Sequence, residues 1–288
     1  MKLSIITINR NNAAGLHKTM ESVLSQTYRD FEYIIIDGAS TDASVDVIRE
    51  YESANLSSSH PLTIIWLSEP DNGIYEAMNK GLKMVHGEYT LMLNSGDYLV
   101  DEHVIERVLP ELDRTDIIQG NNIEEVDNHI YRNRGYGKSD IDFFDVMRGF
   151  FLHQAAFCKK QLFEDYGFFD ETYKMAADTK FFMTCLGIHS ATFRYIDLDI
   201  TNYDTNGISA EKSGRWAELR AEEDNRLRHE LFSDRQLRFF EENERKVRLY
   251  NKLHAHRWVW SIVLFASNLS SWIYTQESIP LRKSIKGE

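Results

Sequence analysis

Short apolar segments alternate with helical patterns near the start of the chain, and this alternation constrains the fold more than any other feature. Four segments rich in β-branched and apolar residues are typical of buried strands: residues 3–8, 31–36, 62–67 and 88–93. Between successive segments, apolar residues recur three or four positions apart, as on one face of a helix. Strands that alternate with helices form parallel βαβ units. The pattern therefore predicts an α/β fold with a mostly parallel central sheet flanked by helices.

Acidic residues follow three of these four strands. Asp37 comes directly after the second strand, Asp71 comes shortly after the third, and Asp97 follows the fourth. In open α/β sheets, ligands bind beyond the carboxyl ends of the strands, so these side chains are expected to converge on one crevice. Carboxylates can hold a hard divalent cation, which in turn can hold a diphosphate. The crevice is therefore expected to take a metal–diphosphate ligand.

The remainder of the chain shows weaker patterns and a change of character near residue 210. The expected elements are a helix at 104–112, a strand at 117–123, a hairpin within 124–140, a helix at 143–149, a strand at 153–158 and a helix at 178–186. Four phenylalanines are expected in the core: Phe150, Phe151, Phe168 and Phe169. Residues 215–256 are rich in charged residues with apolar positions at helical spacing. We therefore predict one domain over 1–210 and a helical segment over 211–288.

Composition narrows the function classes. The chain has 288 residues and a formal net charge of −12. This charge argues against a general nucleic-acid binder, which needs a basic surface, so no nucleic-acid partner is expected. The two cysteines, Cys158 and Cys185, form no metal-type spacing and fit a reducing compartment. The apolar run at the N-terminus is too short for a signal peptide, so a cytoplasmic location is expected. The sequence indicates no oligomeric state.

Several sequence blocks occur in an order that resembles a known family. They are Ser4-Ile5-Ile6-Thr7, Ser25-Gln26-Thr27-Tyr28, the run from Phe31 to Asp42, and Gly87-Glu88-Tyr89. Over about residues 1–210 they resemble the family 2 glycosyltransferases with the glycosyltransferase A fold. Within that family, the blocks at 69–81 and 93–97 resemble a branch that builds bacterial surface polysaccharides.

The resemblance implies a donor-binding role for five of the polar residues. Thr7, Asn9 and Asp37 would line a nucleotide pocket, and Asp71 would also face the nucleotide. Asp97 matches the metal-binding end of the family's acidic motif. The implied cofactor is a divalent cation, Mg²⁺ or Mn²⁺, which would bridge the diphosphate and stabilise the leaving group.

The resemblance also implies an inverting transfer and the residues that carry it. Asp178 matches the family's base position ahead of a helix, and a single carboxylate suffices to deprotonate an acceptor hydroxyl. His153 matches a block near the acceptor pocket and is expected to contact the acceptor or a phosphate. The implied donor is a nucleotide-diphosphate sugar, most simply a UDP-sugar. The implied acceptor is a saccharide, lipid-linked, in surface polysaccharide biosynthesis.

The chain departs from the family's pattern at four positions. The first motif aspartate is replaced by Asn94, the middle one by Gly96, and the second of an Asp-Asp pair by Gly38, while Met78 stands in place of an arginine. Two alternatives therefore remain open. One is a non-catalytic sugar-nucleotide-binding subunit. The other is a nucleotidyltransferase, although such an enzyme would show a Gly-rich loop where this chain has residues 9–12.

Each of these residues also has an ordinary structural interpretation. Asp37 and Asp178 can serve as turn or helix-cap residues, since carboxylates often accept backbone N–H groups at helix starts. His153 can be a hydrogen-bonded interior histidine. Asp71 precedes Asn72-Gly73, which by itself is a common turn sequence. Taken alone, none of these residue types specifies a catalytic site.

The aromatic stretch at residues 257–275 suggests contact with a membrane. It contains Trp258, Trp260, Trp272 and Tyr274, and basic residues precede and follow it. Tryptophan and tyrosine favour the headgroup region, and basic flanks attract anionic lipids. We expect an interfacial helix that makes the protein peripheral on the inner face of the cell membrane. A buried packing helix and a short membrane span are the alternatives.

Overall fold

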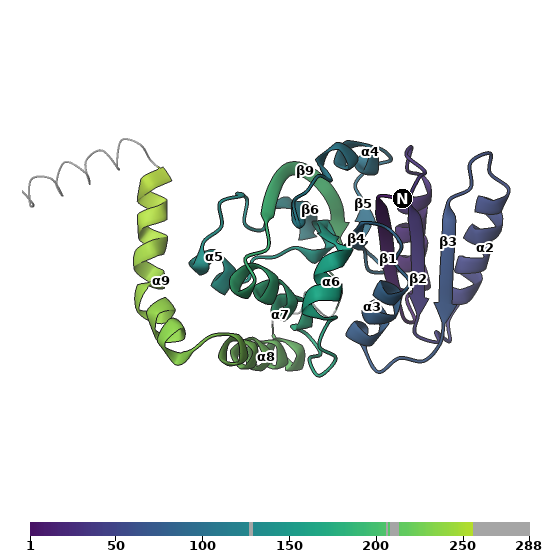
Figure 1. Ribbon diagram of the computed structural model, residues 1–288. Coiled ribbons are helices and arrows are strands. Elements are labelled where there is room, and N and C mark those ends of the chain that lie inside the picture. The colour runs from purple at the N-terminus through teal and green to yellow at the C-terminus, as the bar shows by residue number, and fades with distance from the viewer. Residues whose placement is uncertain (127–128, 206, 208–212, 256–288) are drawn as a thin grey trace, which may run out of the picture. The chain divides into compact units, whose positions relative to one another are not determined.

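The computed structural model describes residues 1–126, 129–205, 207 and 213–255 (Figure 1). The chain divides into two compact units, Met1–Ser233 and Asp234–Glu288. The first unit includes α8 (Arg215–Leu231), a helix that the sequence analysis assigns to the C-terminal segment. In the second unit, the structure describes one helix, α9 (Asp234–Ala255). The stretch at 257–275 lies outside the described residues.

The first four strands form a parallel sheet, as the sequence predicts. They are β1 (Leu3–Asn9), β2 (Glu32–Asp37), β3 (Thr63–Ser68) and β4 (Tyr89–Met92). Their spatial order is β3-β2-β1-β4, with every neighbouring pair parallel. The connecting helices are α1 (Ala13–Leu24), α2 (Ser44–Leu56) and α3 (Ile74–Lys83). The carboxyl ends of all four strands therefore meet at one edge.

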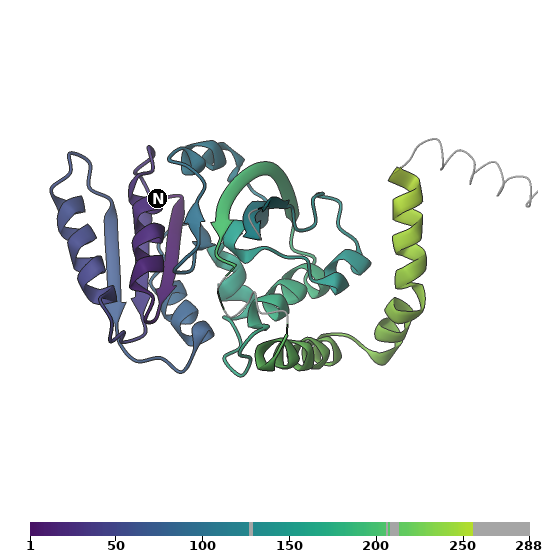
Figure 2. The ribbon, with the colours of Figure 1, turned by 180° about the vertical axis from the view of Figure 1, so that it is seen from behind.

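Helices cover both faces of this sheet because alternate strand residues point to opposite sides. Ile5 and Ile35 join the core cluster that includes Leu16 and Met20 of α1. On the other face, Ile6 lies against α3, where a Cβ built at Gly81 would be 2.5 Å from its Cγ2. Figures 1 and 2, seen from opposite sides, show α3 on one face and α1 with α2 on the other.

The second half of the first unit extends the sheet beyond β4, with strands that run in both directions. β8 (Ala156–Lys159) lies antiparallel between β4 and β6 (Ile117–Val126), and β9 (Phe193–Tyr203) lies parallel to β6. β5 (Tyr98–Leu99) completes the edge, and β7 (His129–Asn133) forms the predicted hairpin with β6. The α/β prediction is confirmed, with a mixed second half. The strand predicted over 153–158 was wrong at its start, because residues His153–Ala155 form a 3₁₀ turn.

Short helices complete the first unit. They are α4 (Val104–Val108), a 3₁₀ turn (Leu109–Glu111), α5 (Phe143–Arg148), α6 (Lys160–Tyr166) and α7 (Ala177–Met183), which continues as a π-helical turn (Thr184–Ile188). The predicted helices at 104–112, 143–149 and 178–186 correspond to these elements. Of these helices, α7 contributes Asp178 and Thr179 to the candidate site.

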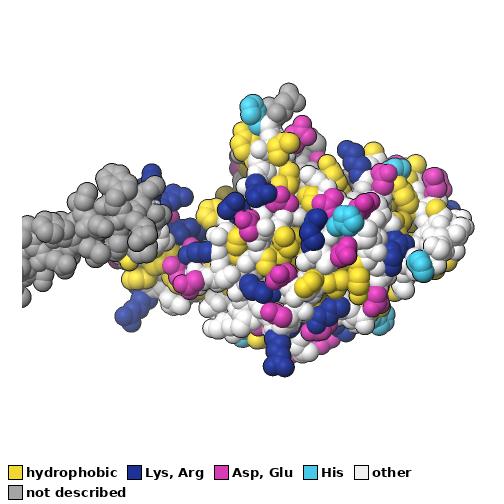
Figure 3. Space-filling view, turned by 90° about the horizontal axis from the view of Figure 1, so that it is seen from above, with side chains coloured by type: hydrophobic (Ala, Val, Ile, Leu, Met, Phe, Trp, Pro, Cys, Tyr) yellow, Lys and Arg dark blue, Asp and Glu magenta, His cyan; other side chains and the backbone are white. Residues whose placement is uncertain are grey.

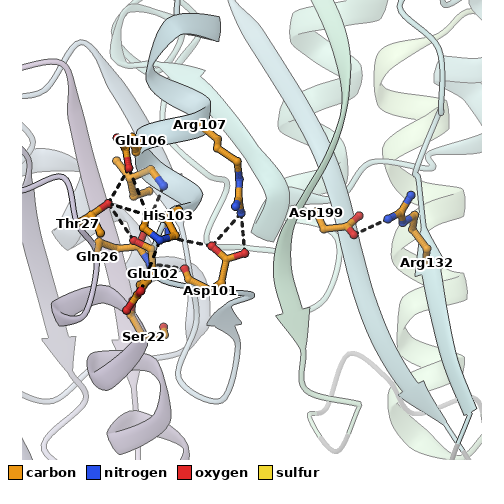
Figure 4. A network of polar contacts seen from close by, with 11 residues as sticks. Ser22, Gln26, Thr27, Asp101, Glu102, His103, Glu106, Arg107, Arg132 and Asp199 are labelled. Atoms are coloured by element: carbon orange, nitrogen blue, oxygen red, sulfur yellow. Dashed lines mark hydrogen bonds and ion pairs between the residues drawn. The ribbon is translucent and has the colours of Figure 1, made fainter.

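Gln26 links the end of α1 to residues 101–105, which follow β5 (Figure 4). Its amide nitrogen donates to the backbone oxygen of Asp101 at 2.7 Å, and its amide oxygen accepts from the backbone nitrogen of Ile105 at 3.0 Å. The side chain is 2% exposed. The block at residues 25–28 therefore has a positioning role: it fixes the segment beyond β4.

The surface carries both signs of charge. On the face seen in Figure 3, lysine and arginine side chains are interspersed with aspartate and glutamate. Two residues predicted in the core lie outside it, since Phe150 is 51% exposed and Phe168 is 41% exposed. Among the described helices, none combines the length and apolar character that a membrane crossing requires.

Candidate active site

Asp37 lies at the carboxyl end of β2 and is enclosed by hydrogen-bond donors. Its Oδ1 accepts from the side chains of Asn9 at 2.9 Å and Ser40 at 2.5 Å. Its Oδ2 accepts from the backbone nitrogen of Ser40 at 2.9 Å and the hydroxyl of Ser68 at 2.7 Å. Burial raises the pKa of this carboxyl, but these hydrogen bonds outweigh the burial and leave the pKa below its usual value. Asp37 is therefore an ionised carboxylate that holds the ends of β1, β2 and β3 together by hydrogen bonds.

Asn9 is the member of this group that retains an acceptor for a ligand. Its side-chain nitrogen is bonded to Asp37, while its Oδ1 is buried and has no hydrogen-bond partner among the described residues. A buried unpaired acceptor is costly, and a ligand N–H group would satisfy it. Thr7, by contrast, is fully buried, and its hydroxyl donates to the Leu93 backbone oxygen and accepts from Tyr33. The predicted contact of Thr7 with a nucleotide stays a prediction.

Asp71 lies over the residue that replaces the family's second aspartate. A Cβ built at Gly38 would be 2.2 Å from Oδ2 of Asp71, so a side chain at position 38 would displace the Asp71 carboxylate. The Asp71 carboxylate is held by the backbone nitrogen of Gly73 at 3.0 Å and faces the Arg10 guanidinium at 3.6 Å. The structure thus brings a carboxylate from another loop beside Gly38. It also brings Asp71 to the same edge of the sheet as Asp37.

The same substitution pattern recurs at the end of β4. Gly96 has φ of +109°, a conformation that favours glycine, and a Cβ there would lie 2.6 Å from Oδ2 of Asp204. The backbone nitrogen of Asp204 donates to Oδ1 of Asp97 at 2.9 Å. The carboxylate of Asp204, the residue that follows β9, therefore lies beside the position of the missing middle motif aspartate. The sequence analysis missed Asp204, since it lies more than a hundred residues from the motif.

Asp97 and Asp204 form a donor set that fits a hard divalent cation. Asp97 is 4% exposed, and its burial raises the pKa of its carboxyl to about 7, with the Asp204 charge adding to the shift. Within the described residues, no group of three or more His, Cys, Asp or Glu side chains could hold a metal ion by itself. Mg²⁺ in phosphate-binding sites commonly uses one or two carboxylates together with the phosphates. The carboxyl groups of Asp97 and Asp204 are ligands of this chemical type.

Asp178 lies at the start of α7 and is held from two sides. Its Oδ1 accepts from the Tyr75 hydroxyl at 2.9 Å, and its Oδ2 lies 2.9 Å from Nδ1 of His153. The Nε2 atom of His153 in turn lies 3.3 Å from the side-chain nitrogen of Asn94. Four side chains from α3, the end of β4, the 3₁₀ turn and α7 thus form one chain of contacts. The sequence analysis named His153 and Asp178, and the structure brings them into direct contact.

The environment of Asp178 keeps its carboxyl ionised. Burial alone raises the pKa of this group, but His153 and Tyr75 outweigh that effect and hold the pKa below its usual value. Tyr75 is buried, and both burial and the Asp178 charge raise its pKa well above the usual value, so its hydroxyl remains a donor. Asp178 is therefore a carboxylate whose orientation is fixed by two donors.

A cavity of about 240 Å³ opens beside this group. Its lining includes Asn94, His153 and Asp178, together with Tyr75, Met78 and Tyr203. Met78, which stands in place of the family's arginine, therefore contributes an apolar wall. The carboxylates of Asp37 and Asp71 belong to the neighbouring strand ends and do not line this cavity.

Glu223 of α8 holds the segment that leads into α7. Its carboxylate accepts from three successive backbone nitrogens, those of Lys174 at 2.7 Å, Met175 at 2.8 Å and Ala176 at 3.1 Å. The side chain is 5% exposed. Because Asp178 follows two residues later, Glu223 sets the position of the candidate base. No sequence signal marked it, since it lies in a charged helical run of the kind that is usually solvated.

Glu223→Gln should lower the free energy of unfolding by about 1.5–3 kcal/mol, because an amide retains one acceptor oxygen and loses the charge that three N–H groups share. The measurement is urea unfolding of the whole chain. The matched control is Glu222→Gln, at the exposed neighbouring position of α8, for which no change is expected. Equal stabilities for the two variants would refute the positioning role.

Comparison with known proteins gives the family. The sequence model of glycosyl transferase family 2 matches residues 4–169. A glycosyltransferase of PGL/p-HBAD biosynthesis from Mycobacterium bovis is 30% identical over 207 residues, which cover 71% of this chain and 77% of that protein. An uncharacterised glycosyltransferase of Mycobacterium tuberculosis is 30% identical over 224 residues, with coverages of 76% and 81%.

Solved structures give the same fold. The S. aureus protein TarS (residues 1–349), crystallised with UDP-GlcNAc, matches with a TM-score of 0.58 at 17% identity. The match covers 76% of this chain and 61% of that one, so this chain spans about three fifths of the TarS fragment. The mannosyltransferase PcManGT from Pyrobaculum calidifontis, in complex with GDP-Man and Mn²⁺, matches with a TM-score of 0.56 at 16% identity, with coverages of 91% and 86%. With the family model matching more than half of its length, this chain belongs to glycosyltransferase family 2 and is a sugar-transferring enzyme.

Proposed function

We propose that this enzyme is a metal-dependent, inverting glycosyltransferase that moves a sugar from a UDP-sugar to a lipid-linked saccharide in surface polysaccharide biosynthesis. The observation that carries the proposal is the Asp178 carboxylate, fixed by Tyr75 and His153 at the wall of a cavity. The carboxyl groups of Asp97 and Asp204, at the ends of neighbouring strands, also support the proposal. The family membership and the relatives named for PGL/p-HBAD biosynthesis fit the same chemistry.

Asp178 is the proposed general base. Two of its lone pairs are used by Tyr75 and His153, and an ionised carboxylate offers about four acceptor positions. An acceptor hydroxyl bound in the cavity can donate to a remaining position. As that oxygen attacks the anomeric carbon from the face opposite the diphosphate, its proton passes to Asp178. His153 steadies the carboxyl group throughout and lies within reach of the acceptor.

Asp97 and Asp204 are proposed to hold the divalent cation, Mg²⁺ or Mn²⁺. Such a cation, when bound, neutralises the charge that develops on the departing diphosphate. The two carboxylates lie on segments from the ends of β4 and β9, and the backbone nitrogen of Asp204 fixes Asp97. Asp97 is buried, whereas Asp204 is partly exposed.

The nucleotide is proposed to lie against Asn9, Asp37 and Asp71. The unpaired Oδ1 of Asn9 suits an N–H group on the edge of a base, such as that of uracil. Asp37 is saturated by four donors, so it acts by holding Asn9 in place. Asp71 and Arg10 face each other beside Gly38, the residue that follows Asp37. TarS, a fold relative, was crystallised with UDP-GlcNAc, which supports the choice of a UDP-sugar.

The experiment is a donor panel. UDP- and GDP-sugars are incubated with the full chain and a membrane extract as acceptor source, with Mn²⁺, Mg²⁺ or EDTA, and released nucleoside diphosphate is measured. Cation-dependent release from a UDP-sugar is the expected result. Release from GDP-sugars alone would overturn the donor assignment. Donor binding without release, in the presence of the extract, would favour the non-catalytic alternative.

The membrane assignment rests on sequence alone. The basic and aromatic composition of residues 257–288 supports a peripheral site on the inner membrane face. Deleting residues 257–288 should release the protein from membranes in a sedimentation assay. Unchanged sedimentation of the truncated chain would refute this assignment.

A further inference from the structure

A second cavity, of about 250 Å³, adjoins the one beside Asp178 and is lined by three arginines. They are Arg148 of α5 and Arg220 and Arg228 of α8. The two cavities share wall residues, among them Thr179, which directly follows the candidate base. Arg220 also borders both cavities. A ligand that spans them would therefore reach from the arginines to Asp178.

Guanidinium groups outnumber carboxyl groups in the lining of this arginine pocket. One carboxyl, that of Asp224, lines it beside the three guanidinium groups. Arg148 also contacts Asp145 at 3.2 Å, outside the lining. Burial raises the pKa of the Asp224 carboxyl. The positive charges of Arg228 and Arg220 lower this pKa, and the negative charges of Asp178 and Glu223 raise it. Since arginine remains protonated in proteins, the three guanidinium groups of the pocket stay positively charged at neutral pH.

The guanidinium of Arg228 has an N–H group without a hydrogen-bond partner among the described residues. Its Nη2 donates to the backbone oxygen of Met147 at 3.2 Å, whereas its Nε is buried without a hydrogen-bond partner in the described structure. A buried unpaired donor is costly, and the planar guanidinium fork matches phosphate and carboxylate geometry. The pocket is also lined by Phe150, whose ring is half exposed and suits the face of a sugar. The lining therefore combines an anion-binding part with an aromatic part.

The donor diphosphate is not the group that this pocket fits. The carboxylates assigned to the donor and its cation, those of Asp37, Asp71 and Asp97, lie outside the pocket. We infer that the arginine pocket binds an anionic group, a phosphoryl or carboxylate, that the acceptor carries near its reacting hydroxyl. This inference rests on the proposed function, since it places the acceptor beside Asp178. It narrows the acceptor to an anionic saccharide or a saccharide joined to phosphate.

Binding of inorganic phosphate to the full chain tests the pocket without requiring turnover. Its dissociation constant, measured by NMR titration, should rise at least fivefold in Arg228→Met and in Arg148→Met. The matched control is Arg49→Met, an exposed arginine of α2, which should leave it unchanged. Thermal melting of each variant identifies any that fails to fold. If Arg228→Met does not fold, Arg228→Lys replaces it. Because lysine keeps the charge, a smaller rise in the phosphate dissociation constant is then expected. Equal phosphate affinities in all folded variants would overturn the inference, whatever the donor panel gives.

Turnover with defined acceptors distinguishes the sources of the anion. Soluble glycosyl phosphates, uronic acid glycosides, lipid-linked saccharide phosphates and neutral glycosides are compared in the wild type and Arg228→Met. The acceptor KM should rise for at least one anionic class in the variant and stay unchanged for neutral glycosides, with the affected class naming the source. An equal change for neutral and anionic acceptors would contradict an anion site. A chain with no turnover at all would refute the proposed function and leave the phosphate result standing.

Discussion

Asp178→Asn should lower kcat by about 10²–10⁴-fold and leave donor affinity within a factor of about two, because general base catalysis typically contributes this much. The amide has nearly the same shape and can still accept from Tyr75, but it cannot take the acceptor proton. The measurement is steady-state transfer with the donor found in the panel, alongside calorimetric donor binding. Since the pKa of Asp178 lies below its usual value, the wild-type base stays ionised at neutral pH.

The matched control is Asp140→Asn, an exposed aspartate in the loop before α5, which should leave both quantities unchanged. His153→Ala should give a smaller loss than Asp178→Asn, since His153 orients the carboxylate. A turnover within threefold of wild type in Asp178→Asn would remove Asp178 from the base role. A loss of donor binding equal to the loss of turnover would instead assign Asp178 to the donor site.

Asp97→Asn should weaken cation-dependent donor binding by on the order of 3 kcal/mol, a factor of roughly a hundred. The substitution removes a charged ligand for the cation while it keeps the side chain's shape. Without added metal, the folded state should tolerate the neutral amide, because the buried Asp97 carboxyl already has a pKa of about 7. The measurement is donor affinity with Mn²⁺ and with EDTA.

Asp204→Asn provides the second arm of this experiment. If Asp204 takes the place of the missing motif aspartate, its loss should also weaken cation-dependent binding, by a smaller amount. The control is Asp46→Asn, an exposed aspartate of α2. Donor binding that is equally strong with EDTA in the wild-type chain would contradict the metal assignment. An unchanged Asp204→Asn variant would leave Asp97 as the sole protein ligand.

Much of the fold could be predicted from local patterns. The parallel βαβ part has continuous apolar strands and clear helix starts, so β1 to β4 fall within a residue or two of their expected positions. The second half is less local. The direction of β8 and the pairing of β9 with β5 and β6 depend on contacts between distant segments, which periodicity does not encode.

The candidate site divides in the same way. Asp37, Asp71 and Asp97 follow strands, so their convergence at one edge was predictable from topology. Glu223 and Asp204 were not, because each acts on a segment that is distant in sequence and has no motif of its own. In the sequence, Gly38 and Gly96 stand where the family's pattern has aspartates, so two carboxylates are missing there. In the structure, the carboxylates of Asp71 and Asp204 lie beside these glycines.

The anomeric configuration of the product tests the central claim, a single displacement with Asp178 as base, most directly. The product formed from an α-linked UDP-sugar is analysed by proton NMR, through the coupling between the first two ring protons. The proposal predicts a β-linked product, because attack from the face opposite the diphosphate inverts the anomeric carbon. An α-linked product would contradict it, since retention requires a different mechanism and a different role for Asp178.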